Sequence, residues 1–150
     1  MGVSRQIVRL DALPAALAVL IAESQQQGFR FLCRLQAEFQ SGANDFRLPG
    51  EGLFAAFEAE RLVAIGGVNQ QTGMLQIGRL RRFYVAADYR RQGVGRELLT
   101  VIEQEAASYF RELYLFTDTL EAAQFYQRQG YVAVSLPDVS HRKTLAGVSS

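Results

Sequence analysis

Residues 82–99 read RFYVAADYRRQGVGRELL, and this stretch is the most informative part of the 150-residue chain. The apolar run from Phe83 to Val85 has the composition of a strand end, and the residues after Gly95 return to helical spacing. Between them lies a short basic loop in which Gly93 and Gly95 stand at alternate positions. The stretch therefore predicts a strand, a loop and the N-terminus of a helix.

A helix N-terminus preceded by such a loop is a candidate phosphate site. The first amides of a helix lack intrahelical partners and carry a partial positive charge. Gly93 and Gly95 have no Cβ, so a ligand can approach the backbone closely. Arg90, Arg91 and Arg96 add cationic donors at the same place. We predict a diphosphate ligand; the alternative is that the glycines only form a tight strand-to-helix turn.

Two common nucleotide motifs do not fit the stretch. A P-loop requires a lysine followed by Ser or Thr after its second glycine, and no such lysine is present. The dinucleotide fingerprint requires a third glycine where this chain has Leu98, and it belongs after a first strand rather than past the middle of the chain. The ligand is therefore expected to be a diphosphate of another kind.

The remainder of the chain alternates between strand and helix patterns without repeats or a low-complexity linker. Three strands of hairpin type are followed by strand–helix–strand crossovers, which predicts one α/β (α+β) domain, 1–150, with a mixed sheet and helices on its faces. We expect strands at 6–10, 53–59, 62–68, 75–85, 113–116, 131–135 and 139–145, and helices from 11 or 14 to 27 and at 29–40, 94–110 and 120–129.

The composition restricts the classes of function. A net charge of +1 argues against a protein that binds nucleic acid or an anionic membrane non-specifically. The single cysteine, Cys33, excludes an internal disulfide and a cysteine-rich metal site, so we expect no metal and a cytoplasmic location. Residues 1–6 lack the features of a signal peptide, no apolar run is long enough to span a membrane, and residues 146–150 are expected to be loose.

Two motifs resemble one family. Arg90-x-x-Gly93-x-Gly95, preceded by Phe83 to Val85, is similar to the acetyl-CoA signature of the GNAT superfamily of N-acetyltransferases. Further along, Ala122-x-x-Phe125-Tyr126-x-x-x-Gly130-Tyr131 resembles the later helix and turn of that superfamily. The resemblance implies a GNAT-like fold, in which a mostly antiparallel sheet of about seven strands carries about four helices on its two faces.

The resemblance also implies an activity: direct attack in a ternary complex moves an acetyl group from acetyl-CoA to a primary amine of a small molecule, a peptide or a protein. Particular residues would then have particular roles. The amides of residues 91–96 would hold the CoA pyrophosphate, and the backbone of residues 83–85 would pair with the pantetheine arm and polarise the thioester carbonyl. Tyr126 would be catalytic and protonate the departing thiolate. The implied cofactor-binding residues are Phe83, Tyr84, Val85, Arg90, Arg91, Gln92, Gly93, Val94, Gly95, Arg96, Thr119 and Tyr126.

The chain departs from the family pattern at two places. Many family members carry a glutamate on the central strand that takes a proton from the amine, and this strand has arginine there. The remaining candidates for the base are Glu23, Glu38, Glu51 and His141, or water relayed through backbone carbonyls, although His141 on a terminal strand is otherwise expected to be exposed. Thr119 stands where the family often has an asparagine that contacts the cofactor.

The arginines of the central strand suggest a second property. Strand alternation predicts that Arg79 and Arg81 share one face and that Arg82 lies on the other, unless a β-bulge intervenes. If the first face borders the acceptor, the substrate would carry a carboxylate or phosphate beside its amine; the alternative is a solvated or ion-paired face.

Two other functions remain open at this point. A non-catalytic acetyl-CoA sensor or interaction module would keep the cofactor site without the base. A nucleic-acid-binding domain would use the arginines, but the chain carries no nucleic-acid motif. An apolar edge strand near the C-terminus is a candidate for pairing across a homodimer.

Overall fold

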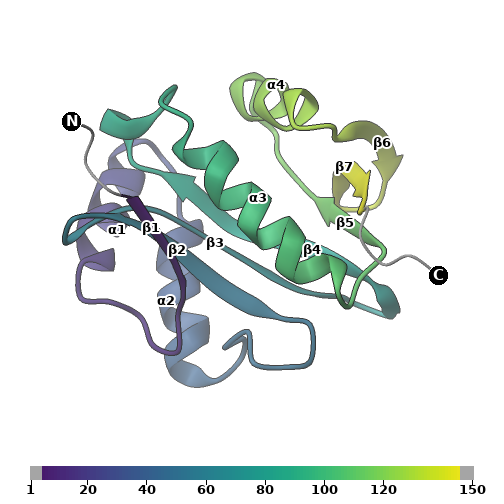
Figure 1. Ribbon diagram of the computed structural model, residues 1–150, viewed down its shortest axis with the longest axis horizontal. Coiled ribbons are helices and arrows are strands. Elements are labelled where there is room, and N and C mark those ends of the chain that lie inside the picture. The colour runs from purple at the N-terminus through teal and green to yellow at the C-terminus, as the bar shows by residue number, and fades with distance from the viewer. Residues whose placement is uncertain (1–4, 146–150) are drawn as a thin grey trace.

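Seven strands and four helices make up residues 5–145, the part of the chain that the computed structural model describes (Figure 1). The expectations for residues 1–4 and 146–150 concern positions outside this range. The strands are β1 (Arg5–Arg9), β2 (Gly52–Glu58), β3 (Arg61–Gln71), β4 (Met74–Val85), β5 (Glu112–Leu115), β6 (Val132–Leu136) and β7 (Val139–Thr144). The helices are α1 (Leu17–Gln26), α2 (Phe31–Ser41), α3 (Val94–Ala107) and α4 (Leu120–Arg128), with a short 3-10 helix, η1 (Ala87–Tyr89).

Every strand and helix predicted from the sequence is present, and the differences lie at the ends. Thr119 caps α4, since its Oγ1 accepts a hydrogen bond from the amide of Ala122 at 3.3 Å. Gly130, with φ of 96°, follows the end of the same helix in the left-handed conformation. The first helix begins only at Leu17, after a turn in which the amide of Leu17 donates to Pro14 O. The 3-10 helix η1 was not predicted.

The strands form one sheet in the order β1-β2-β3-β4-β5-β7-β6. Every neighbouring pair is antiparallel except β4 and β5, which run parallel. This parallel ladder is short, because it joins Ile77–Arg79 of β4 only to Glu112–Tyr114 of β5. From Leu80 to Val85, β4 therefore has a ladder partner on the β3 side but none on the β5 side. The sheet opens between the two strands at this end.

A β-bulge interrupts β4 within the same segment. Tyr84 pairs with Ile65, but Arg81 pairs with Gly67, so β4 contains one more residue than β3 between these pairs. Arg82 has a positive φ of 59°. The extra residue inverts the alternation of side chains, so that Leu80 and Phe83 pack on one face while Tyr84 packs on the other.

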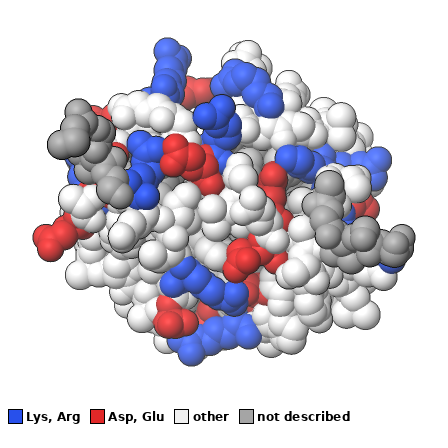
Figure 2. Space-filling view, in the orientation of Figure 1, with Lys and Arg blue, Asp and Glu red and all other residues white. Residues whose placement is uncertain are grey.

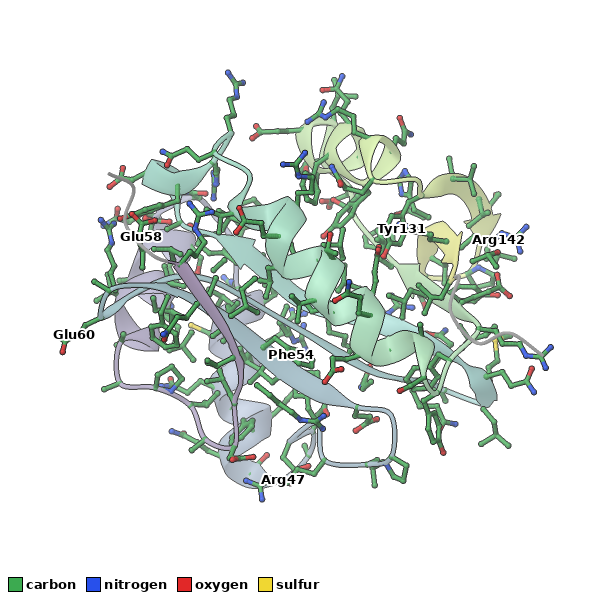
Figure 3. All side chains as sticks on the ribbon, viewed as in Figure 1. Arg47, Phe54, Glu58, Glu60, Tyr131 and Arg142 are labelled. Atoms are coloured by element: carbon green, nitrogen blue, oxygen red, sulfur yellow. The ribbon has the colours of Figure 1, made fainter. Side chains whose placement is uncertain are left out.

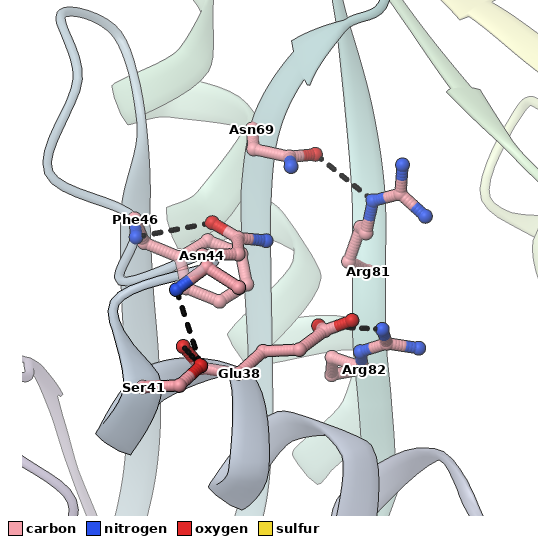
Figure 4. Close-up of polar contacts among 8 residues, drawn as sticks. Glu38, Ser41, Asn44, Phe46, Asn69, Arg81 and Arg82 are labelled. Carbon is pink, nitrogen blue, oxygen red and sulfur yellow. Dashed lines mark hydrogen bonds and ion pairs between the residues drawn. The ribbon is translucent and has the colours of Figure 1, made fainter.

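The bulge overturns one expectation about the arginines. Arg82 does not lie on the face opposite Arg81, because its side chain forms an ion pair with Glu38 of α2 at 2.8 Å. Arg81 lies on this same side, beside Asn69 (Figure 4). Regular alternation fails here because the inserted residue shifts the pleat.

Two apolar cores lie on the two faces of the sheet. α3 and α4 cover one face, on which Leu98, Ile102 and Tyr126 are buried. α1 and α2 cover the other face, on which Leu20, Leu35 and Tyr84 are buried. In Figure 1, α3 crosses in front of the sheet and α1 and α2 lie behind it. The open part of the sheet is thus bordered by α3 and α4 in front and by α2 behind.

At the C-terminal end of the sheet, β7 and not β6 pairs with β5. β7 lies between β5 and β6, so the last strand is internal and β6 forms the edge. Val132 and Leu136 of β6 are exposed at 58% and 45%.

Among residues 5–145, no helix combines the length and apolar character needed to cross a membrane.

Replacing Gly78 by alanine should weaken the parallel junction of β4 and β5. A Cβ at this position would stand 2.7 Å from Phe110 Cδ2 and 2.8 Å from Leu113 Cδ2, both buried. Overpacking of this kind costs about 1–3 kcal/mol of unfolding free energy. Urea unfolding of Gly78→Ala and of Gln76→Ala, an exposed position on the same strand, measures the effect. Equal midpoints for the two variants would contradict it.

Candidate functional site

The N-terminus of α3 presents a row of unpartnered amides. The amide of Glu97 donates to Gly93 O at 3.0 Å, but no backbone amide from Arg91 to Arg96 donates to an acceptor within residues 5–145. Arg91 and Gly93 adopt positive φ angles of 64° and 83° on either side of Gln92. Alternation of right- and left-handed residues turns successive amides into one concavity, which is a general form of anion site. The arrangement fits a diphosphate.

Glycine is needed at the two positions of this loop for different physical reasons. Gly93 caps α3 in the left-handed conformation, and a Cβ there would meet nothing closer than 3.7 Å. Gly93 is therefore required by its backbone angles. Gly95 is buried within the first turn of α3, and a Cβ there would stand 3.2 Å from Phe125 Cζ and 3.3 Å from Val85 Cγ2. Gly95 lets α3 approach α4 closely. Val94, between them, is buried in the core.

The arginines around this N-terminus do not act alike. The Arg90 side chain turns toward α1, where Nε donates to Val85 O at 3.0 Å and Nη2 donates to Gln27 Oε1 at 3.0 Å. Arg91 and Arg96 are exposed and make no side-chain hydrogen bond within residues 5–145. Gln92 donates to Asp88 O at 2.8 Å and so stabilises the loop. Lys and Arg side chains lie over the upper part of the molecule, around the start of α3 (Figure 2). Arg91 and Arg96 are thus the free cations beside the amides.

The predicted pantetheine-binding residues lie along the open side of β4. Phe83 and Val85 pack toward the α3 face, and the Phe83 ring stacks on Phe125 with centroids 5.9 Å apart. Tyr84 points to the opposite face, where its hydroxyl donates to the carboxylate of Glu23. Burial, followed by the contact with Glu23, raises the pKa of Tyr84. The backbone of this segment therefore borders the opening, while its side chains anchor the strand to both faces.

Tyr126 lies at the centre of an aromatic cluster beside this segment. Its ring centroid is 6.1 Å from that of Phe83 and 5.6 Å from that of Tyr131, and the residue is 7% exposed. Its hydroxyl has no hydrogen-bond partner within residues 5–145, and burial raises the pKa of the phenol. Such a group keeps its proton at neutral pH and has it available to donate.

The hydroxyls of Tyr131 and Thr119 serve structural purposes. The hydroxyl of Tyr131, labelled in Figure 3, donates to Glu103 of α3 at 2.9 Å. Burial and then the charge of Glu103 raise the pKa of Tyr131. Thr119 is occupied by its capping bond at the start of α4. The tyrosine that resembles the family's proton donor is therefore also the one whose hydroxyl is unpartnered.

The four candidate bases differ in their hydrogen-bond partners and in their position relative to β4. Glu23 accepts from Tyr84 and from the amide of Ala87, and Glu51 is buried, accepting from the amides of Leu48 and Gln70. Both carboxylates hold loops in place. His141 is 5% exposed, so the expectation that it is exposed is wrong; its Nδ1 lies 2.8 Å from Ser140 Oγ. Glu38 alone of the four reaches the bulge of β4, through its ion pair with Arg82.

Comparison with known proteins identifies the family. Residues 49–133, more than half of the chain, match the profile of the acetyltransferase (GNAT) domain. The chain belongs to the GNAT acetyltransferase family. A search of curated protein sequences returned no significant match. The seven-stranded mixed sheet with four helices in residues 5–145 is the GNAT fold, as the sequence resemblance implies.

Solved structures of GNAT proteins superpose over nearly the whole chain. A protein from Exiguobacterium sp. 255-15, assigned as an acetyltransferase, is 29% identical, has a TM-score of 0.85 and covers 94% of this chain and 93% of its own. An acetyltransferase from Streptococcus agalactiae 2603 is 20% identical with a TM-score of 0.75, covering 94% and 98%. An aminoglycoside 6'-N-acetyltransferase complexed with coenzyme A is 18% identical with a TM-score of 0.73, covering 97% and 99%.

Sequence reasoning missed two features of this GNAT site. The bulge at Arg82 has no local signal, because no glycine or proline marks it. The pairing of Glu38 with Arg82 joins residues 44 positions apart and depends on how α2 packs against the sheet. Among residues 5–145, no cluster of three or more His, Cys, Asp or Glu side chains is arranged to hold a metal ion.

Stability should fall as the pH rises above about 10, the ordinary pKa of tyrosine. Tyr126 and Tyr131 have raised pKa values in the folded state, so the unfolded chain loses their protons first. The free energy of unfolding that the two protonated tyrosines contribute is complete below pH 10. It is lost as the pH rises toward their pKa values in the folded state, at up to about 1.4 kcal/mol per pH unit for each tyrosine. Urea unfolding across alkaline pH measures the slope, which should be shallower in Tyr131→Phe. An unchanged slope in that variant would disprove the assignment.

Proposed function

We propose that this protein transfers an acetyl group from acetyl-CoA to a primary amine in a ternary complex. The observation that carries the proposal is the row of unpartnered amides from Arg91 to Arg96, which lies at the end of the open side of β4, where Gly95 packs beside Val85. Tyr126, whose ring lies beside Phe83 of the same segment, has a hydroxyl without a partner among residues 5–145. The three features supply a phosphate site, an opening for an extended arm and a proton donor. Acetyl-CoA would require the order pyrophosphate, pantetheine and thioester, and the contacts of Gly95 with Val85 and of Tyr126 with Phe83 along β4 support it.

The chemistry assigns a task to each feature. As the amine nitrogen bonds to the thioester carbonyl carbon, negative charge develops on the carbonyl oxygen, and a backbone amide on the open side of β4 is placed to stabilise it. The carbon–sulfur bond then breaks, and Tyr126 supplies the proton that the departing thiolate requires. The nitrogen of the new amide gives up its extra proton to water, and a proton from water restores the Tyr126 phenol. Burial makes the phenol a weaker acid, but a thiolate in the same apolar surroundings is also a stronger base.

None of the residues from Gln92 to Gly95 has a charged side chain, so this part of the loop would bind phosphate through its backbone amides. The contribution of the arginine side chains on either side can be tested separately. Arg91→Ala combined with Arg96→Ala should weaken acetyl-CoA binding by about tenfold, because two exposed phosphate contacts are lost while the amides remain. Calorimetric titration with acetyl-CoA at moderate salt measures this change. Arg90 is unsuitable for the test, since its side chain supports the strand end through Val85 O.

The control for this titration is Arg111→Ala, because Arg111 is an exposed arginine at the start of β5, where the sheet is closed. We expect its affinity for acetyl-CoA to match that of the unmodified protein. Absence of saturable binding at millimolar acetyl-CoA would refute the transferase and the sensor functions together.

Replacing Tyr126 by phenylalanine tests catalysis separately from binding. The unpartnered hydroxyl makes no structural hydrogen bond, so the variant should fold and bind acetyl-CoA within about threefold of normal. Its kcat should fall by about a hundredfold, which is the usual contribution of a positioned acid. Tyr131→Phe provides the comparison, because that hydroxyl is bonded to Glu103. Turnover that survives in Tyr126→Phe would assign the proton to another donor.

A non-catalytic acetyl-CoA sensor is the second candidate function. The observation in its favour is the arginine-rich segment of β4, where many family members carry the glutamate base. Release of free CoA in the presence of a panel of amines separates the two, since a sensor binds acetyl-CoA and releases none. We further propose that residues 1–150 form a single domain, which limited proteolysis tests by the survival of one fragment. We also propose that the protein is cytoplasmic and that β6 mediates any homodimer.

A further inference from the structure

Three half-buried arginines gather on the α2 side of β4, beside the opening in the sheet. Arg81 and Arg82 lie near Asn69 of β3 and Glu38 of α2 (Figure 4). Together with Arg79, which pairs with Asn69 across the β3–β4 ladder, they are called here the arginine cluster. The bulge creates the cluster, since it brings the Arg82 side chain to the side already occupied by Arg81. Three like charges this close together are unfavourable unless anions accompany them.

The protein provides too little negative charge for the arginine cluster. Arg82 pairs with Glu38, whereas Arg81 donates from Nε to the neutral amide of Asn69 at 3.1 Å. Arg79 donates to Gln71 Oε1 and to the backbone carbonyl of Asp138 at 2.5 Å. Neither Arg79 nor Arg81 forms an ion pair with a carboxylate within residues 5–145. The cluster therefore keeps a net positive charge even when the nearby carboxylate of Asp138 is included.

The polar atoms of the cluster point to the same deficit. The two terminal nitrogens of Arg81 make no hydrogen bond to residues 5–145, and Arg82 Nε is fully enclosed without a partner. Burial lowers the pKa of the Arg79 and Arg81 guanidinium groups, and for Arg81 the charges of Arg79 and Arg82 add to this effect. Such donors are unusual without an acceptor, because an unpaired charge in a sheltered site is costly.

The position of the cluster connects it to the reaction. Arg82 directly precedes Phe83, whose ring contacts Tyr126 on the other face of the sheet. Beyond Arg79, β4 has no ladder partner on the β5 side, so the backbone of this segment is not occupied by β5. Two strand residues span about 7 Å, so a molecule of amino-acid size can place one end at Arg81 and the other beside the thioester.

We propose that the acetyl acceptor is a small amine that carries an oxyanion, either a carboxylate or a phosphate, and that Arg81 with Arg79 binds this oxyanion. The inference rests on the proposed acetyl transfer and adds the class of acceptor to it. A planar guanidinium with free donors matches both kinds of oxyanion. Glu38 holds Arg82 in place at the edge of the site and disfavours a second anion there.

Matched pairs of acceptors test this inference. ω-Amino acids of increasing length are compared with alkylamines of the same length, and phosphoethanolamine is compared with ethanolamine, by release of free CoA. At least one anionic member should exceed its neutral partner in kcat/KM by about tenfold, which corresponds to one charge-assisted contact. The carboxylate series and the phosphate pair distinguish the two sources of the oxyanion. Equal rates within every pair would overturn the proposal.

Variants of the cluster provide the second arm. In Arg81→Gln the ratio of kcat/KM between the anionic and neutral members should fall by about tenfold, whereas Arg111→Gln, which removes an exposed arginine away from the cluster, should preserve the ratio. A loss that is equal for both members would mean that Arg81 only supports the fold, and would overturn its role.

Two measurements separate failure of this inference from failure of the proposed function. Acetyl-CoA titration of each variant comes first, since absence of binding refutes the transferase itself. Thermal melting with inorganic phosphate or with 5-aminopentanoate then reports anion binding without turnover. Both ligands should raise the melting temperature of the unmodified protein more than that of Arg81→Gln. Normal acetyl-CoA binding with no difference in melting would overturn the anion site alone.

Discussion

The early divergence of β4 from β5 is the constraint on which the site depends. A parallel pair that continued to Val85 would saturate the backbone of both strands and leave no opening between the faces. Here the ladder ends after three residue pairs, and α3 and α4 meet farther along β4, where Gly95 packs beside Phe125 and Val85. Backbone donors and acceptors that pairing would consume thus remain available, close to the amides at the start of α3.

The bulge in β4 determines which side chains lie on each face of the sheet beside this opening. It faces Phe83 toward the aromatic cluster around Tyr126, and it turns Tyr84 toward Glu23 on the far side. If Arg82 took a regular place in the pleat instead of forming a bulge, Tyr84 would lie on the same face as Leu80. A single inserted residue therefore provides the apolar surroundings of one face and the cationic character of the other.

Local patterns were sufficient to predict the strands, the helices and the loop before α3. Each of these rests on contacts within a few residues, such as the Thr119 cap and the left-handed Gly93. The same patterns did not reveal the bulge, the burial of His141 or the partner of Arg82, because these depend on the register of β4 against β3 and on the packing of α2. Among the residues predicted to bind acetyl-CoA, Gly95 packs beside Val85 and Tyr126 beside Phe83, whereas the side chain of Arg90 turns away toward α1.

The internal position of β7 has a consequence for how the protein forms during synthesis. β5 is held by three residue pairs to β4 and by four to β7, and β7 leaves the ribosome after β1 to β6. While β7 is still in the exit tunnel, β5 lacks its larger neighbour, although β1 to β4 can already pair antiparallel in sequence order. The junction of β4 and β5 is thus secured only after β7 has emerged, and nascent chains can carry β1 to β4 as a paired sheet before the candidate site is complete.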